Sequence, residues 1–311
     1  MKDAIEAVKQ AYMAFANGRV QLAPVVHLNV QRYNGEVDIK SGYVEDFGLI
    51  GTKIASGFYD NPKLGLPSTV AVIVLMDLKT SVPLAILDGT YITAVRTGAA
   101  GAVAASVLAR KDSTKVGVIG AGSQGRMQVL ALNEIFHLSR VTVFDNVESS
   151  RIRYASEMSN RLGIEVRAVD NPRDAVLDAD IVATVTPSRQ PIVMDQYVTE
   201  GMHINAIGAD APGKQELDPK IMTRAKIVVD SLAQCRVIGE IQHALSMGLI
   251  NEGNIHAEIG EILNGTKSGR ENANEITLFD STGLAAQDIA AANVVYRIAK
   301  ERNMGVKVKI L

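Results

Sequence analysis

The stretch Lys115-Val-Gly-Val-Ile-Gly-Ala-Gly-Ser-Gln-Gly-Arg-Met-Gln-Val-Leu130 decides the fold class of the second half of this chain. A short apolar run leads into three glycines with the spacing G-x-G-x-x-G: Gly120, Gly122 and Gly125. In a strand–loop–helix turn the first glycine permits the tight turn, the second lets backbone approach a pyrophosphate, and the third lets helix and strand pack closely. The helix N-terminus then offers free N–H groups to phosphate. The stretch therefore predicts a dinucleotide-binding loop.

An acidic residue in the right place makes this prediction more specific. Asp145 lies twenty residues after Gly125 and ends the next apolar run. A carboxylate there can accept hydrogen bonds from the ribose hydroxyls and would repel a 2′-phosphate, so we expect NAD(H). NADP(H) is the alternative if Arg151 or Arg153 reaches a phosphate; otherwise these arginines are solvated helix charges.

Strand and helix signals alternate from Lys115 onward. The segments are 115–119, 124–136, 140–145, 149–162, 165–169, 172–177, 181–184, 203–207 and 227–229. This alternation is typical of a doubly wound parallel sheet, so we expect an α/β protein with a Rossmann-type NAD-binding domain over residues 112–284.

The rest of the chain has a different pattern. Helical spacing over 2–17 precedes short β-rich runs at 25–30, 51–56, 70–77 and 84–87, and alanine-rich helices are expected at 97–110 and 284–300. We expect residues 1–111 and 285–311 to form a discontinuous α+β domain for substrate binding and dimerisation.

Composition excludes several classes of protein. The formal net charge is −2, from 32 basic and 34 acidic residues without long runs of one sign, so no nucleic-acid or membrane surface is expected. Cys235 is the only cysteine, and the five histidines lack the spacing of a metal motif. No apolar run reaches the roughly 20 residues of a membrane span, and no secretory signal is evident. We expect a cytoplasmic protein without a metal.

Three further stretches carry a family resemblance. They are Asp88-Gly-Thr-Tyr-Ile-Thr-Ala-Val-Arg-Thr-Gly-Ala-Ala-Gly-Ala-Val-Ala-Ala105, His203-Ile-Asn-Ala-Ile-Gly-Ala-Asp-Ala-Pro-Gly-Lys-Gln-Glu-Leu217 and Phe279-Asp-Ser-Thr-Gly-Leu-Ala-Ala-Gln-Asp288. They resemble the ornithine cyclodeaminase/μ-crystallin family, and most of all its archaeal-type alanine dehydrogenase branch. The resemblance implies a nicotinamide cofactor in a Rossmann domain, dimers formed through the other domain, and chemistry at the Cα–N bond of amino or imino acids.

The resemblance also implies substrate-binding cations. Arg96 matches the family's substrate arginine, and a guanidinium can bind a carboxylate through two hydrogen bonds. Lys53 lies in an apolar run, where an unpaired ammonium is unfavourable, and matches the substrate lysine, which can also move a proton. Lys40 stands where the family commonly has an arginine, so it is either a substrate contact or a solvated loop charge.

The remaining candidates follow predicted strands. Asp210 matches the cyclodeaminase aspartate that holds the substrate's amino group; the alternative is an Asx turn before Pro212. Polar residues near the predicted cofactor path are either cofactor contacts or ordinary caps and turns: Thr97, Ser123, Gln124, Thr184, Thr186 and Ser281.

The expected function is therefore NAD(H)-dependent interconversion of a small L-2-amino acid and its 2-imino or 2-oxo acid, with alanine as the first substrate to test. An ornithine or lysine cyclodeaminase, or a cyclic ketimine reductase, is the enzymatic alternative. A crystallin-like binding protein that keeps the fold is the non-enzymatic alternative.

Overall fold

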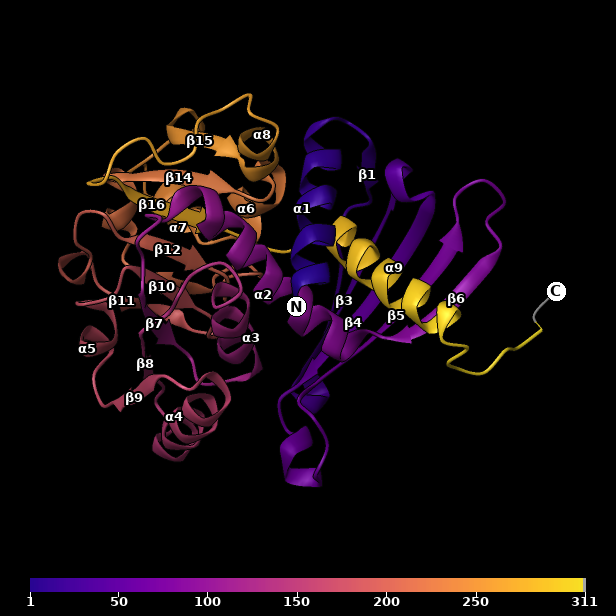
Figure 1. The fold of residues 1–311 in the computed structure, drawn as a ribbon, viewed down its shortest axis with the longest axis horizontal. Coiled ribbons are helices and arrows are strands. Elements are labelled where there is room, and N and C mark those ends of the chain that lie inside the picture. Colours follow the sequence, from indigo (N-terminus) through magenta and orange to yellow (C-terminus); the bar gives the residue numbers. More distant parts are fainter. Residues whose placement is uncertain (310–311) are drawn as a thin grey trace. The chain divides into compact units, whose positions relative to one another are not determined.

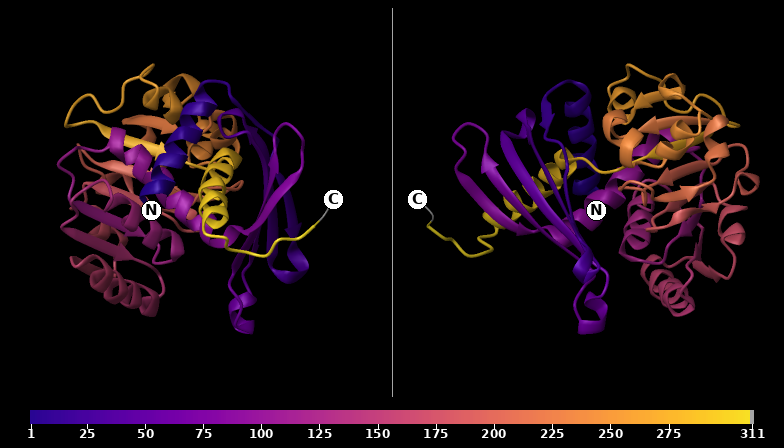
Figure 2. Two further views of the ribbon diagram at one scale, coloured as in Figure 1. Left: turned by 45° about the vertical axis from the view of Figure 1, so that its right-hand side comes forward. Right: turned by 180° about the vertical axis from the view of Figure 1, so that it is seen from behind.

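The computed structural model describes residues 1–309 of the chain, which divides into two compact units. Unit 1 comprises Met1–Ile5 and Thr97–Gly283, and unit 2 comprises Glu6–Arg96 and the chain from Leu284 onward. Each unit is described by itself (Figures 1 and 2).

Unit 1 is built on a parallel sheet of eight strands in the order β15-β14-β16-β12-β10-β7-β8-β9. The bounds are β7 Lys115–Ile119, β8 Arg140–Phe144, β9 Glu165–Val169, β10 Ile181–Thr184, β12 His203–Ala206, β14 Ala225–Val229, β15 Ile255–Glu258 and β16 Ile276–Asp280. The strand order reverses between β7 and β10, where a doubly wound fold binds its ligand. The predicted α/β fold class is confirmed.

Helices cover both faces of this sheet (Figure 1). One apolar core joins the strands to α2 (Gly89–Leu108), α3 (Ser123–Leu132) and α4 (Glu148–Leu162). A second core joins them to α5 (Pro172–Val176), α6 (Leu232–Ile238) and α7 (Ile241–Ser246). The central strands β7 and β10 are apolar along most of their length because both of their faces are buried, whereas the edge strand β9 is partly exposed.

Smaller elements complete unit 1. They are the two-stranded sheet of β11 (Arg189–Val193) and β13 (Gln215–Leu217), the short helices η4 (Asp195–Tyr197), η5 (Pro219–Thr223), η6 (Glu252–Asn254) and α8 (Ile259–Leu263). The sequence did not predict these elements, because their segments are short and lack a clear period.

Unit 2 has an antiparallel sheet of six strands, and α9 (Ala285–Glu301) lies across it (Figure 2). The strands are β1 Val20–Leu22, β2 Val26–Val30, β3 Gly35–Val44, β4 Leu49–Phe58, β5 Thr69–Asp77 and β6 Pro83–Asp88. Helix α9 packs mainly on β3 and β4, and α1 (Lys2–Ala16) contacts it through Tyr12. Short turns η1 (Gln31–Tyr33), η2 (Glu45–Phe47) and η3 (Asn61–Leu64) connect the strands.

The structure differs from the sequence-based interpretation at two places. Lys40 lies in the middle of the ten-residue strand β3 and is buried, so the solvated-loop alternative for this residue is wrong. The helix expected from Thr97 begins at Gly89, because Asp88 accepts a hydrogen bond from the backbone N–H of Thr90 (2.8 Å) and caps residues that are themselves weak helix formers.

The boundary between the units differs from the one expected at residue 112. The C-terminal half of α2 belongs to unit 1, where Ala105 and Ala109 pack against Val116 and Val118 of β7. By length and composition α2 is apolar enough to span a membrane, but 72% of its most apolar window is buried within the protein, as is common in a core helix.

Candidate active site

Two lysines lie side by side on the inner face of the unit 2 sheet. Lys40 of β3 and Lys53 of β4 are directly opposite in the antiparallel register, so their side chains share one face. Lys53 is 3% exposed and Lys40 is also buried. The face they share is the one covered by α9.

Helix α9 brings a carboxylate to these lysines. Lys53 Nζ donates a hydrogen bond to Asp288 Oδ1 (2.9 Å) and lies 2.8 Å from Oδ2. Arg96 Nε lies 2.8 Å from the same Oδ1, and Arg96 Nη1 donates to Gln287 Oε1 (3.0 Å). The structure thus gathers all three predicted substrate cations of unit 2, Lys40, Lys53 and Arg96, around one acid, with side chains of both Lys53 and Asp288 almost completely buried.

This setting changes the protonation of both partners. The pKa of Lys53 is lowered to about 7. Burial is the largest cause, the charges of Arg96 and Lys40 also lower this pKa, and the charge of Asp288 raises it. Burial acts to raise the pKa of Asp288, but the charges of Arg96 and Lys53 outweigh it and hold that pKa below its usual value. Near neutral pH the carboxylate is therefore ionised and Lys53 can either accept or donate a proton.

The glycine loop of unit 1 has the geometry of a phosphate cradle. A side chain at Gly125 would place Cβ only 2.3 Å from the carbonyl oxygen of Gly120, so the close packing needs glycine. A Cβ at Gly122, by contrast, would meet nothing within 4 Å. The loop is open where backbone would approach a pyrophosphate, directly at the start of α3.

Two polar groups beside the loop suit a dinucleotide. Asp145 accepts hydrogen bonds from the backbone N–H of Ala121 (2.8 Å) and of Val147 (2.9 Å), one on each carboxylate oxygen. Each oxygen keeps a further lone pair for a ribose hydroxyl. Gln124 Oε1 is buried without a hydrogen-bond partner among the described residues. The residues present therefore fit the cofactor predicted from the sequence.

The other predicted cofactor contacts lie at or near the carboxyl ends of unit 1 strands, except Thr97 and Ser123. Thr184 ends β10, Thr186 follows it, and Ser281 follows β16. Thr97 is within α2, where its carbonyl accepts from Gln128 Nε2 (2.9 Å), and Ser123 opens α3.

Buried acids that the sequence did not single out hold these loops. Glu216 Oε1 accepts from both the backbone N–H (2.6 Å) and the hydroxyl (2.7 Å) of Thr186, and its Oε2 accepts from Gly208 N–H (3.0 Å). Asp230 accepts from the Ser281 hydroxyl (2.8 Å) and from Gly283 N–H (2.7 Å). The sequence gives one indication of this role: Asp230 follows strand β14, and Glu216 lies in the short strand β13.

Asp210 is exposed and follows β12 in unit 1. Lys214 Nζ donates a hydrogen bond to Asp210 Oδ1 (2.6 Å), a partner that the sequence analysis missed. The Asp210 carboxylate is accessible and has a cation beside it.

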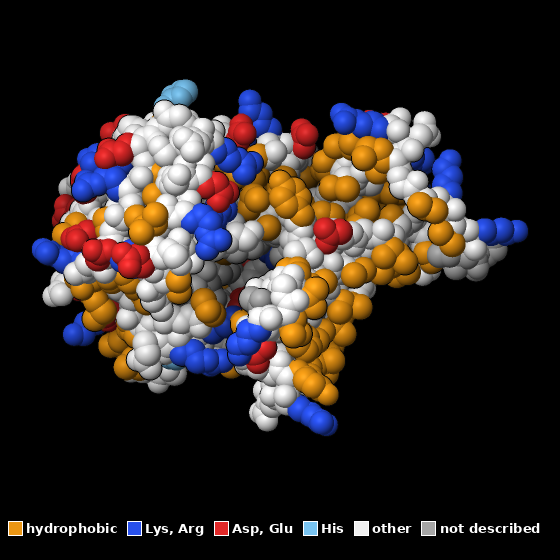
Figure 3. Space-filling view, turned by 90° about the horizontal axis from the view of Figure 1, so that it is seen from below, with side chains coloured by type: hydrophobic (Ala, Val, Ile, Leu, Met, Phe, Trp, Pro, Cys, Tyr) orange, Lys and Arg blue, Asp and Glu red, His pale blue; other side chains and the backbone are white. Residues whose placement is uncertain are grey.

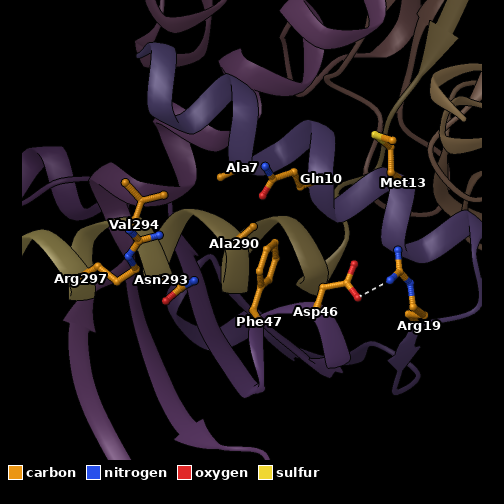
Figure 4. Close-up of a pocket in the computed structure, with 10 residues that line it drawn as sticks. All are labelled: Ala7, Gln10, Met13, Arg19, Asp46, Phe47, Ala290, Asn293, Val294 and Arg297. Carbon is orange, nitrogen blue, oxygen red and sulfur yellow. Dashed lines mark ion pairs between the residues drawn. The ribbon is translucent and has the colours of Figure 1, made fainter.

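A groove of about 550 Å³ lies elsewhere in unit 2, between α1, η2 and α9 (Figure 4). Gln10, Phe47 and Arg297 line it, and Arg19 pairs with Asp46 at one end (2.8 Å). No predicted site residue lines this groove. Across residues 1–309, no three His, Cys, Asp or Glu side chains are grouped as a metal site would need.

Comparison with known proteins places the chain in a family. The family model described as ornithine cyclodeaminase/mu-crystallin matches residues 1–303. The chain belongs to this family. It is 43% identical to alanine dehydrogenase of Archaeoglobus fulgidus over 99% of this chain and 94% of that protein. It is 33% identical to iminosuccinate reductase of Paracoccus denitrificans over 99% and 95%.

Solved structures of the family share the whole fold. An archaeal alanine dehydrogenase dimer with bound NAD has a TM-score of 0.95 at 43% identity, covering 100% of this chain and 95% of that one. The Δ1-pyrroline-2-carboxylate reductase of Thermococcus litoralis, in complex with NADH and L-proline, has a TM-score of 0.96 at 40% identity, covering 99% and 96%. The resemblance found in the sequence is confirmed.

Proposed function

We propose that this chain is an NAD(H)-dependent oxidoreductase that interconverts a small L-2-amino acid and its 2-imino or 2-oxo acid. The observation that carries the proposal is the buried cluster of unit 2, in which Lys53 and Arg96 share the one carboxylate of Asp288. Two buried cations on one acid leave a positive charge that a substrate carboxylate would balance. Relatives at 43% and 33% identity are an alanine dehydrogenase and an iminosuccinate reductase.

Arg96 is proposed to bind the substrate carboxylate, with Lys40 beside it. Among the described residues, Arg96 contacts Asp288 through Nε and Gln287 through Nη1, which leaves its Nη2 donors for a ligand. A planar guanidinium already fixed on one edge is oriented for the incoming carboxylate.

Lys53 is proposed to move the proton at the substrate nitrogen. With a pKa of about 7 its neutral amine can take a proton from the substrate ammonium, and its ammonium can return one to the imine. A nicotinamide cofactor, when bound, would supply the acceptor for the hydride at Cα. Asp210, exposed and paired with Lys214, is proposed to hold the amino group.

The proposed cofactor is NAD(H), held by the loop of Gly120, Gly122, Ser123, Gln124 and Gly125 and by Asp145. Neighbouring structures at 43% and 40% identity contain NAD and NADH. Thr97, Thr184, Thr186 and Ser281 are proposed as further contacts. We also propose a cytoplasmic enzyme, since Cys235 is a buried free thiol.

One assay tests the proposal. Purified protein is mixed with NAD⁺ and alanine, proline or ornithine, and NADH is followed by absorbance and products by mass spectrometry. We expect steady NADH formation with alanine, slower formation with NADP⁺, and a KM for the amino acid raised about tenfold by Arg96→Lys. Arg297→Lys, an exposed arginine of the same unit, is the matched control.

Other outcomes of this assay would identify the alternatives. Proline and ammonia from ornithine without net NADH would make the protein a cyclodeaminase. Absence of every activity, with ligand affinity unchanged in Asp210→Asn and Lys53→Ala, would leave a binding protein. A marked preference for NADP⁺ would contradict the role of Asp145.

A cyclic imine is the second candidate substrate. The chain has a TM-score of 0.96 with the T. litoralis reductase that binds L-proline. NADH formed from proline but not from alanine would select this substrate.

We further propose a homodimer formed through the outer face of the unit 2 sheet. Large apolar side chains are exposed there, including Ile54 and Val72, which are directly opposite, and Ile86, which is 69% exposed. Figure 3 shows hydrophobic side chains gathered over unit 2. Exposed patches of this kind mark protein interfaces, and the archaeal alanine dehydrogenase structure is a dimer.

A further inference from the structure

Asp288 lies in the first turn of α9, an arrangement that suits a buried negative charge. The helix N-terminus carries partial positive charge, which favours an acid in that turn. The preceding residue, Gln287, is fixed by three hydrogen bonds: its Oε1 accepts from Leu284 N–H (2.9 Å) and from Arg96 Nη1 (3.0 Å), and its Nε2 donates to the Tyr12 hydroxyl. The turn that carries Asp288 is therefore rigid.

Helix α9 can bring this turn to the sheet because β4 has a glycine beneath it. A Cβ at Gly51 would lie 2.4 Å from Ile289 Cγ1, so any side chain there would displace the helix or Ile289. Ile289 follows Asp288 directly, and Gly51 is two residues before Lys53 on the same face of the strand. The close approach at Gly51 thus sets the distance between Asp288 and Lys53.

We propose that Asp288 is a positioning residue for the reaction: it holds the Lys53 ammonium and the Arg96 guanidinium at fixed places on the inner face of the sheet, where each would act on the substrate. The proposal rests on the proposed function and deepens it. Asp288 binds Lys53 through both oxygens and Arg96 through one, so a single acid orients the proton carrier and the carboxylate anchor together.

The charge of Asp288 also controls when Lys53 is protonated. The charged groups that face Lys53 are Lys40 from β3, Arg96 from α2 and Asp288 from α9, while its neighbour on β5 is Ile73. Only Asp288 favours the ammonium form. If its charge is removed, burial and two cations act on Lys53 without opposition, so the amine loses its proton at lower pH.

The test is the pH dependence of kcat/KM for amino-acid oxidation. We expect kcat/KM to rise with pH as Lys53 becomes neutral, and this rise is the limb of the pH profile that the variants should move. In Asp288→Asn we expect this limb to move to lower pH by about 1–3 units. Asp288→Glu keeps the charge and should leave the limb at the wild-type pH. Asp46→Asn, which removes an ion-paired acid elsewhere in unit 2, is the control and should not move it. A limb that stays in place in Asp288→Asn, with kcat lowered equally at every pH, would overturn the proposal.

A second measurement covers the case in which Asp288→Asn folds poorly. Leaving Lys53 buried without its counter-charge is destabilising, so Lys53→Met should raise the melting temperature of Asp288→Asn. A double variant that melts no higher than Asp288→Asn would contradict the proposal. This comparison needs no turnover, so it still tests the role of Asp288 if the assay shows no oxidoreductase activity and the proposed function fails.

Discussion

Four carboxylic acids are completely buried together in unit 1: Glu216, Asp230, Glu240 and Asp280. Burial raises the pKa of Glu216 and of Asp280 to about 7 each, and it raises that of Glu240 well above its usual value, with the charge of Glu216 adding to the effect. Glu240 Oε1 accepts from the backbone N–H of Glu216 (2.9 Å) and Leu217 (2.7 Å), whereas its Oε2 is buried without a partner. A protonated Glu240 avoids an uncompensated buried charge.

These acids predict how the stability depends on pH. A group whose pKa is higher in the folded than in the unfolded state stabilises fully below the unfolded value, and this contribution is lost as pH rises through the folded value. For Glu216 the window runs from 4.5 to about 7. We expect the unfolding free energy to fall across this window by an amount on the order of 1–3 kcal/mol, and the melting temperature to fall with it.

Glu240→Gln should flatten that decline, because the amide keeps an acceptor for both backbone donors and cannot ionise. Glu252→Gln, at an exposed glutamate of the same unit, is the matched control and should keep the wild-type slope. Equal slopes for both variants, measured by thermal melting at each pH, would contradict this account.

At the scale of elements, most parallel strands of unit 1 could be predicted to within one or two residues, because apolar residues dominate central strands such as β7 and β10, which are buried on both faces. Strand β15 was not predicted, since its four residues include a histidine and a glutamate. Strand β3 was not predicted: polar and apolar residues do alternate from Glu36 to Lys40, but Ser41 and Gly42 end this short run, and the strand is defined by its pairing with β2 and β4 on both sides. The beginning of α2 was missed for a similar reason, since its cap and not its composition starts the helix.

The approach of α9 to β4 gives a prediction for these two elements. Gly51→Ala should lower the unfolding free energy by about 1–3 kcal/mol and slow the reaction, because Ile289 must move and Asp288 shifts with it. Gly57→Ala, on the same strand, is the control, since its Cβ would meet neighbours at an ordinary 3.6 Å. Thermal melting and NADH formation measure both effects, and equal behaviour of the two variants would show that the helix is not seated at Gly51.

At the scale of the whole molecule, the sequence predicted the residues of the candidate site better than their partners. Lys53 was selected because an ammonium in an apolar segment needs a partner or a site, and because it matches a lysine of the family that the sequence resembles. Arg96 and Lys40 were selected through that resemblance. Asp288 and Gln287 were not selected, because both look like ordinary residues in the first turn of an alanine-rich helix, and Asp288 is 235 positions from Lys53. Contacts over such separations are set by topology, which local patterns do not contain.

The exposed apolar face of unit 2 predicts the state of association. Light scattering should give twice the mass of one chain for the wild type, and Val72→Glu should shift the protein to monomers by placing a charge in the buried centre of the interface. Ile152→Glu, at a 55% exposed position on α4 in unit 1, should leave the dimer intact. A wild-type monomer, or a Val72→Glu dimer of undiminished affinity, would contradict the proposed interface.

The hydrogen bond between Lys53 and Asp288 has a consequence for the order in which the protein is made. The strands of unit 2 leave the ribosome long before α9, which is the helix that covers their inner face. Until that helix is synthesised, Lys53 has no Asp288 beside it and the apolar residues Ile73 and Leu75 have no helix over them. We therefore expect unit 2, which carries Lys53 and Arg96, to become native only at the end of synthesis, after unit 1 has had its full sequence available to fold.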